Sequence, residues 1–261
     1  MQTVNLAAIV LAILILVAFI AIEAAGQYLG QHARKRRTTP AADGQFSTIQ
    51  AALLGLLGLL LGFGFSGGMT RFAERRQSLV QEANAIGTAF LRADLLDEPH
   101  RGNLRTALAD YADTRTAMAE LPDSGLEDYR ARSEALHGTM WDVAVQGVKA
   151  RPETMLAVLP AVNEVIDSHT VRWSIMHRHA PWVAMVALVA TAIASLFSVG
   201  YGFGLSQNPN RWIARTCAVT VAIVLWICVD LDYPRIGLIR LDESALHELR
   251  DDLRENLGEQ P

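Results

Sequence analysis

The chain has 261 residues, of which 51% are hydrophobic, and its mean hydropathy is +0.21. This composition excludes an ordinary water-soluble domain, because the apolar residues gather in runs long enough to cross a lipid bilayer. The formal net charge of −4 lacks the basic excess of a nucleic-acid-binding protein. We therefore expect a membrane protein that contacts the lipid bilayer and binds no nucleic acid.

The first membrane span is expected over residues 4–22, which hold no charged side chain. A cleaved signal peptide is the alternative, but residues 1–5 carry no Lys or Arg and the apolar run is longer than that of a signal peptide. A hydrophilic link over 23–46 follows, with consecutive basic residues at 34–37. Under the positive-inside rule, these cations place the link in the cytoplasm and the first residue outside.

The second span is expected over residues 48–68, which are also free of charge. Gly55, Gly58 and Gly62 share one face of this helix. Small residues at such spacing let helix backbones approach closely in lipid, so this face is expected to hold copies of the chain together. The glycine run at 62–68 follows an apolar span rather than a strand. It therefore predicts helix contact and a bend instead of a phosphate-binding loop.

Residues at the end of the second span are candidates for a pore. Phe63 or Phe65 would form a hydrophobic constriction, although two residues apart on a straight helix they cannot both face one axis. The alternative for either ring is contact with lipid or a neighbouring helix. Arg71, Arg75 and Arg76 would form a positive ring that attracts inorganic anions if the second spans surround an axis. A solvated exit from the membrane is the alternative for these arginines.

Residues 70–180 have a helical pattern and are expected to form an extramembrane domain. Its helices are expected over about 72–96, about 101–121, up to about 149, and from about 152 to 177. Two apolar stripes follow the first of these helices. One comprises Phe72, Leu79, Ala83, Ile86 and Phe90, and the other comprises Val80, Gly87, Leu91 and Leu95. Asn84 interrupts the second stripe and is expected to be a buried hydrogen-bonding residue that fixes register between subunits.

The second membrane pair, within residues 181–231, comprises spans over about 182–205 and 213–229. Thr191, Ser195 and Ser198 lie on one face of the third span and would line a pore weakly. Hydrogen bonds between helices are the alternative role for such residues.

The C-terminal tail, residues 232–261, contains a short piece that is expected to be extended and then an amphipathic helix with a leucine stripe. Asp230 and Asp232 follow the last span and are weak candidates for a cation site. The better expectation is a cap or an ion pair with an arginine such as Arg235 or Arg240.

The chain lacks the patterns that carry catalysis or bind cofactors, such as HExxH, CxxC and Walker-type loops. His177 and His179 point to different faces of a helix, and with His169 they do not predict a metal site. No expected span has a charged residue near its middle, which argues against a proton relay or a coupled transporter. We expect neither an enzyme nor a bound cofactor.

Two motifs resemble a family of bacterial four-span membrane proteins described as bestrophin-like. The first runs over residues 82–96 and reads EANAIGTAFLRADLL, and the second runs over residues 231–240 and reads LDYPRIGLIR. The basic link and the two pairs of spans around a helical insert fit the same family. Bestrophins are homopentameric anion channels in which the second span lines the pore, so the resemblance implies a ring, a pentamer, with that function. In bestrophins an acidic cluster after the last span helps to bind calcium, and the match here is confined to Asp230 and Asp232.

The expected protein is all-α, with four transmembrane helices and a helical domain inserted between the second and third spans. The first pair occupies residues 1–69. We expect a homo-oligomeric passive anion channel of the chloride type in the bacterial inner membrane. The alternative is a non-conducting scaffold or sensor whose helical domain binds a partner. In bestrophins the helical domain is cytosolic, whereas the basic link here predicts a periplasmic domain and periplasmic termini.

Overall fold

The computed structural model describes residues 6–36, 43–119, 126–206, 211–234 and 237–258. Every regular element in these ranges is helical, which confirms the all-α class and leaves the piece expected to be extended without a strand. The helices are α1 (Leu6–Arg36), α2 (Asp43–Ala93), α3 (His100–Ala119), α4 (Leu126–Ala150), the 3₁₀ turn η2 (Pro152–Thr154), α5 (Met155–Met176), α6 (Trp182–Leu205), α7 (Arg211–Asp232) and α8 (Ser244–Asn256).

The chain divides into two compact units. Unit 1 comprises Met1–Phe72 and His179–Arg240, and unit 2 comprises Ala73–Arg178 and Leu241–Pro261. The last part of the tail therefore belongs to unit 2, together with the segment between the second and third spans. Each unit has its own cluster of buried apolar side chains.

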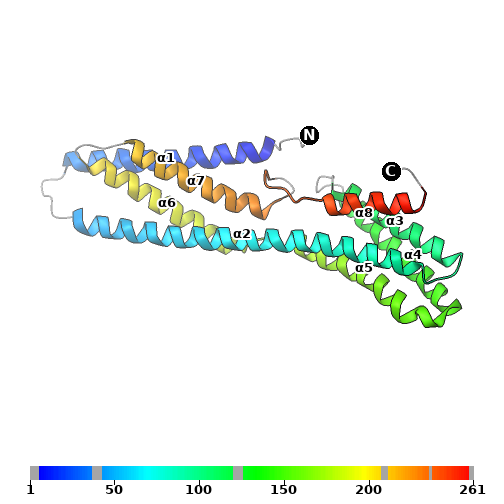
Figure 1. Ribbon diagram of the computed structural model, residues 1–261. Helices are drawn as coiled ribbons and strands as arrows, with labels where there is room; N and C mark the ends of the chain where they lie inside the picture. The colour runs from blue at the N-terminus through cyan, green and yellow to red at the C-terminus, as the bar shows by residue number, and fades with distance from the viewer. Residues whose placement is uncertain (1–5, 37–42, 120–125, 207–210, 235–236, 259–261) are drawn as a thin grey trace. The chain divides into compact units, whose positions relative to one another are not determined.

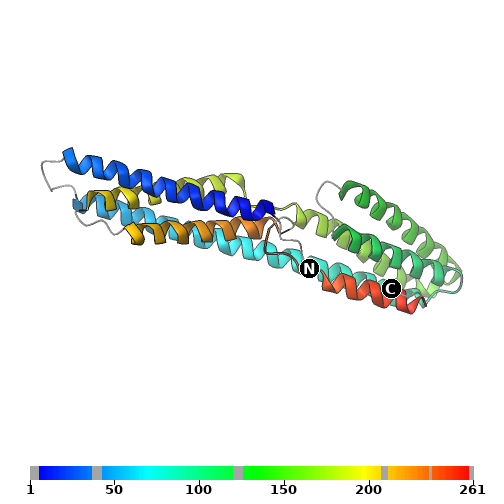
Figure 2. The same cartoon turned by 90° about the horizontal axis from the view of Figure 1, so that it is seen from above.

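Unit 1 is a bundle in which α1, the first part of α2, α6 and α7 run side by side (Figures 1 and 2). These four helices are long and apolar enough to cross a membrane and correspond to the four expected spans. Phe19, Leu57, Leu196 and Leu225 lie in the core between them. Many outward-facing leucines, isoleucines and valines stay exposed, as expected for helices whose outer faces contact lipid.

The first helix differs from the sequence-based expectation. The hydrophilic link was expected to begin at residue 23, but α1 continues without a break to Arg36. Its buried stripe also continues, through Glu23, Gly26 and Gly30. One charged residue does not end a helix when the following residues contain no proline and can still pack. The Glu23 side chain thus lies inside the bundle rather than in a link.

The glycine run does not interrupt the second helix, because α2 continues through it from Asp43 to Ala93. A glycine inside a helix costs roughly 1 kcal/mol relative to alanine in water. In lipid the backbone has no water to bond with, so the helical hydrogen bonds strongly favour the regular form.

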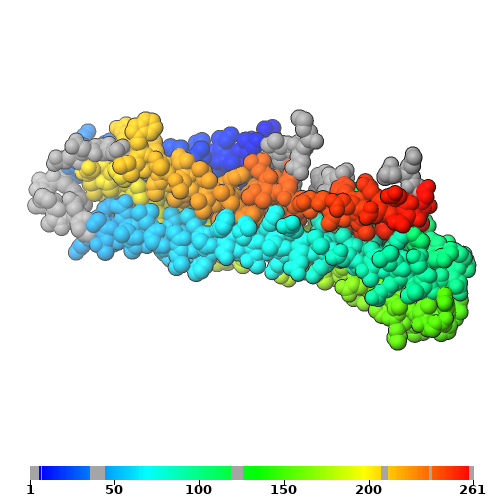
Figure 3. Space-filling view, viewed as in Figure 1, coloured from blue at the N-terminus to red at the C-terminus, as the bar shows by residue number. Residues whose placement is uncertain are grey.

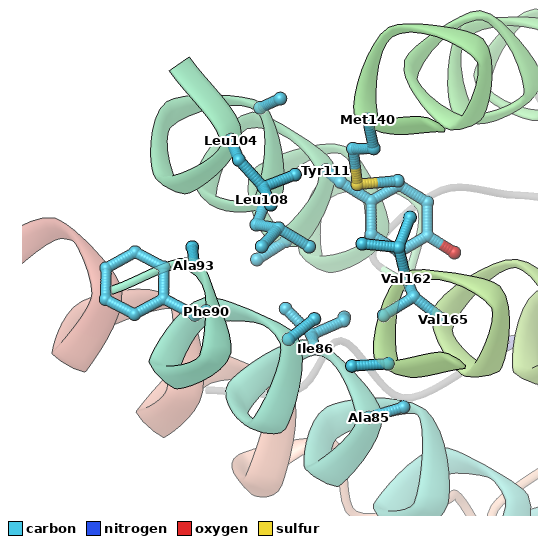
Figure 4. Close-up of a cluster of buried hydrophobic side chains, with 14 of the residues drawn as sticks. Ala85, Ile86, Phe90, Ala93, Leu104, Leu108, Tyr111, Met140, Val162 and Val165 are labelled. Carbon is cyan, nitrogen blue, oxygen red and sulfur yellow. The ribbon is translucent and has the colours of Figure 1, made fainter. Parts of the chain in front are cut away.

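Unit 2 packs the second part of α2 with α3, α4, α5 and α8. Figure 4 shows the ring of Tyr111 on α3 lying among Met140 of α4 and Val162 and Val165 of α5. Four of the five residues of the first predicted stripe of α2, Leu79, Ala83, Ile86 and Phe90, are buried in this core, whereas Phe72 is half-buried and belongs to unit 1. Leu246 and Leu253 of α8 are buried in the same core, as the leucine stripe of the tail predicts.

Candidate functional site

The face of α2 that carries its first glycines is open in unit 1. A Cβ atom built on Gly55, Gly58 or Gly62 would meet no atom within 4 Å. In contrast, a Cβ on Gly68 would touch Leu231 at 3.3 Å, because that side of the helix is packed. Figure 3 shows the 43–72 part of α2, in light blue to cyan, lying uncovered on the face toward the viewer. The glycines expected at an oligomer contact are therefore available for one.

The two phenylalanines of α2 are both exposed, Phe63 by 66% and Phe65 by 43%. Because successive residues turn by about 100°, the two rings lie about 160° apart around the helix. They flank the open glycine face on opposite sides. Only one of them can face a common axis, and which one does so stays a prediction.

The polar residues of α6 face other parts of the bundle. Ser195 is completely buried, and its hydroxyl donates to the backbone oxygen of Leu53 on α2 at 3.2 Å. Ser198 is buried as well, whereas Thr191 donates to the backbone oxygen of Ala187 on its own helix. The structure thus brings Ser195 against α2 but away from the open face, and pore lining by these residues stays a prediction.

The three arginines after the second span have different surroundings. Arg71 is bound to Asp232, with Nε and Oδ1 2.6 Å apart. Arg75 is buried and donates to the backbone oxygen of Arg178 at 2.8 Å. Arg76 is the exposed one of the three. A positive ring at the mouth would therefore depend mainly on Arg76, because a carboxylate neutralises Arg71.

Asp232 joins three spans of unit 1. Besides binding Arg71 of α2, its carboxylate accepts from the backbone N–H of Ala180, just before α6, at 3.0 Å. A negative charge at the N-terminal end of a helix is favourable. The ring of His179 stacks on that of Tyr233 and its Nδ1 lies 3.1 Å from the backbone oxygen of Asp232. The tail motif thus connects the middle of α2, at Arg71, with the start of α6 and the end of α7.

Asp230 has a different role in the same motif. Its carboxylate accepts from the backbone N–H groups of Leu238 and Ile239, at 2.8 and 2.7 Å. A Cβ on Gly237 would lie 2.6 Å from Asp230 Oδ1, so only glycine fits there without a shift. The two aspartates serve as a cap and an ion-pair partner. Among the described residues no group of three or more His, Cys, Asp or Glu side chains is placed to hold a metal ion.

The most strongly charged buried site lies in unit 2, around Glu82 of the first motif. Glu82 is 0% exposed and accepts from Arg115 Nε at 2.7 Å and from Arg172 Nη1 at 2.5 Å. The hydroxyl of Tyr111 donates to the same carboxylate at 2.8 Å. Burial acts to raise the pKa of Glu82, but the guanidinium groups of Arg115 and Arg172 lower it to about 2. Glu82 is therefore an ionised carboxylate whose two oxygens both have donors.

Two histidines complete this cluster. Their rings meet edge to face, with the centroids of His137 and His169 4.9 Å apart. His169 Nδ1 lies 3.4 Å from the hydroxyl of Tyr111. Burial, and then the charge of Arg115, lowers the pKa of His169 to about 4 and also lowers that of His137. Both histidines are neutral at neutral pH, so they add no charge beside the arginines.

Sequence reasoning placed Glu82 in a motif but missed its partners. Arg115 and Arg172 are 33 and 90 residues away from it. One feature of the sequence does indicate a buried charge at this position. Glu82 lies between Leu79 and Ile86 on a helix face that is otherwise apolar. A buried carboxylate needs cations near it, but the sequence does not show which arginines those are.

Comparisons with known proteins give one family. The model of the bestrophin-like domain matches residues 10–246. A crystal structure of a bacterial bestrophin homologue from Klebsiella pneumoniae is 14% identical, with a TM-score of 0.71 over 95% of this chain and 99% of that chain. A single-substitution variant of that homologue has a TM-score of 0.74 at 13% identity, over 95% of this chain and 99% of that one. No curated protein matches the chain. At these identities the structural likeness shows the fold.

Proposed function

We propose that this chain, which belongs to the bestrophin-like family, assembles into a ring around α2 and conducts anions passively through it. The observation that carries the proposal is the open glycine face of α2, where a Cβ atom built on Gly55, Gly58 or Gly62 would meet no atom within 4 Å. In lipid, helix association depends on close packing, and small residues allow it. A second copy of the same helix is the occupant that a homo-oligomeric family implies.

The second part of α2 supports self-association as well. In unit 2, Val80, Leu91 and Leu95 are exposed, and Leu91 by 71%. Asn84 lies exposed on the same stripe of the single chain, so its burial between subunits stays a prediction. Apolar stripes with one amide side chain are typical of contacts between helices. A hydrogen bond of that amide then fixes how the two helices are aligned along their length. We expect a neighbouring copy of the chain to cover this stripe in the assembled protein, which a ring of five copies would allow.

A ring of α2 helices would place Phe63 or Phe65 at a narrow apolar point. Such constrictions gate channels by excluding water. Arg76, the exposed arginine beyond the span, would raise the local anion concentration at the mouth. The basic residues at 34–37 favour a cytoplasmic link and a periplasmic unit 2, which we retain as the proposed orientation in the inner membrane.

Assembly is tested with glycine variants of the purified protein. Gly58→Leu fills the proposed contact, and Gly138→Leu is the matched control, because Gly138 on α4 also faces open space. We expect Gly58→Leu to reduce the molar mass measured by light scattering while Gly138→Leu leaves it unchanged. A monomeric wild-type protein contradicts the ring.

Conduction is tested in planar bilayers under a chloride gradient. We expect an anion-selective reversal potential and a several-fold larger conductance in Phe63→Ala or Phe65→Ala, whichever ring faces the axis. Phe197→Ala is the matched control, since Phe197 on α6 is also exposed, by 37%. A folded ring that carries no current contradicts the channel and favours a scaffold or sensor.

A further inference from the structure

Glu23 is an acidic residue inside the membrane-spanning bundle. It lies on the buried side of α1, and only 1% of its surface is exposed. Gln27, one turn further along, is 7% exposed on the same side. Ionisable residues within membrane spans are rare because the charged form is costly there, and they usually have a specific function.

The backbones of α1 and α6 touch at this level. A Cβ on Gly200 would lie 2.0 Å from the backbone oxygen of Glu23, and one on Gly204 would lie 2.3 Å from that of Gln27. Gly200 comes five residues before the end of α6 at Leu205, which is about 8 Å along a helix. The backbone of Glu23 therefore meets α6 more than one turn before the end of that helix, whereas the backbone of Gln27 meets Gly204, one residue before the end.

Both side chains have a buried polar atom without a hydrogen-bond partner among the described residues. These atoms are Oε1 of Glu23 and Nε2 of Gln27. Leaving a buried donor or acceptor unpaired costs roughly 1–3 kcal/mol. In their present side-chain conformations Glu23 and Gln27 therefore each leave one buried polar atom without a hydrogen bond.

The N–H of Gln27 can donate to Oε1 of Glu23 in either protonation state, whereas a proton on Glu23 also removes the buried charge and supplies a donor for the amide oxygen. A neutral carboxyl has an O–H donor and a C=O acceptor, and the amide of Gln27 has the complementary acceptor and donor. Residues four apart are neighbours on a helix, so rotations of the two side chains suffice to join them. An ionised carboxylate offers acceptors only and adds the cost of a buried charge.

No charged group among the described residues forms an ion pair with the carboxylate of Glu23. α6 and the 48–68 part of α2 contain no charged residue. From α7, Arg211 and Arg215 act on Glu23 through their charge, but both are exposed, and Cys217 is the other titratable group there. On α1, Arg34 donates to the backbone oxygen of Ser206 at the end of α6.

We infer that Glu23 is a proton-binding site inside the membrane, with its carboxyl neutral at neutral pH and paired with the amide of Gln27. Ionisation of this carboxyl in base would leave a charge at the contact of α1 with α6. Proton occupancy therefore links the packing of these two spans to pH. The inference holds for a single chain and does not depend on conduction.

Infrared spectroscopy of the full chain in lipid vesicles tests the inference. We expect a C=O stretching band of a protonated carboxyl at neutral pH that is lost in Glu23→Gln and declines in base. Glu153→Gln is the matched control, because Glu153 is exposed and ion-paired with Arg151, and it should leave the band unchanged. Gln27→Leu should shift the frequency of the band, because it removes the bonded amide.

Two results overturn the assignment. The first is identical spectra for the wild type and Glu23→Gln. The second is a band that appears only in Arg215→Gln, which shows that Glu23 is ionised by Arg215 in the native chain. If Glu23→Gln does not fold, Glu23→Asp keeps the carboxyl and moves it by one methylene. A band that does not shift in that variant also overturns the assignment.

Discussion

Arg71 on α2 donates a hydrogen bond to Asp232 on α7, with Nε and Oδ1 2.6 Å apart. Both side chains are largely buried, so this is an ion pair with little exposure to water. The two residues are 161 positions apart, and the same carboxylate accepts from the backbone N–H of Ala180 before α6. The pair therefore fixes the ends of three spans relative to one another.

Replacing one partner of this pair should destabilise unit 1. In Asp232→Asn the Arg71 charge keeps its position but loses its counter-ion, and we expect the free energy of unfolding to fall by about 2 kcal/mol. Thermal unfolding in detergent measures the change. Glu98→Gln is the control, since the ion pair of Glu98 with Arg101 is exposed and such pairs contribute little to stability. Equal losses in the two variants contradict a special role for Asp232.

The cluster around Glu82 should be the most sensitive charged site in unit 2. Glu82→Gln removes the nearest carboxylate from both buried arginines and leaves Arg172 only the more distant one of Glu243, at 3.8 Å, so we expect a loss of about 3–5 kcal/mol. Tyr111→Phe removes one hydrogen bond to the same carboxylate and should cost about 1 kcal/mol. Chemical denaturation followed by circular dichroism gives both values. If Glu82→Gln lowers the free energy of unfolding by less than Tyr111→Phe does, the ion cluster does not stabilise unit 2 as proposed.

Unit 2 should lose stability in acid in two steps. The pKa of His169 is lowered from 6.5 to about 4 by burial, so the unfolded chain binds more protons than the folded one between these values. The free energy of unfolding therefore falls as the pH falls through this window, by roughly 1–3 kcal/mol. Below a pH of about 4.5 a second loss follows down to about 2, because the pKa of Glu82 is lowered by its arginines.

Thermal unfolding over a pH series separates these two steps. His169→Gln should flatten the first step and leave the second, because Gln does not titrate and Glu82 keeps its arginines. His137 contributes to the first step in the same direction, since its pKa is also lowered. An unchanged slope between pH 6.5 and about 4 in His169→Gln excludes His169 as the source.

Two Gly→Ala substitutions should change the stability of the protein in opposite directions. In Gly237→Ala the new Cβ would lie 2.6 Å from Oδ1 of Asp230 and disturb the cap on the tail, so we expect a loss of about 1–3 kcal/mol. Gly138→Ala in the exposed middle of α4 has open space around it and should gain roughly 0.5–1 kcal/mol from helix propensity. We expect the melting temperature of Gly237→Ala to lie below that of the wild type and the melting temperature of Gly138→Ala to lie above it. A neutral Gly237→Ala means that the tail shifts at little cost.

Much of the fold follows from local pattern in the sequence. Uncharged runs predict the four apolar helices, and the stripe through Leu79 and Ile86 predicts which face of α2 enters the core of unit 2. The start of α5 after Pro152 and the buried leucines of α8 follow in the same way. These features depend on residues that are neighbours along one helix, so the helical period of 3.6 residues is enough to predict them.

The tertiary structure decided which charged residues meet. The sequence analysis named Arg235 or Arg240 as the partner of an aspartate, and Arg235 lies outside the described residues. In the structure Asp232 binds Arg71, and Glu82 binds Arg115 and Arg172. It also placed Glu23 inside the bundle rather than in a link. Such pairs join residues far apart in the chain, and helical periodicity carries no information about which helix faces which. The burial that makes those charges matter exists only once the helices have packed.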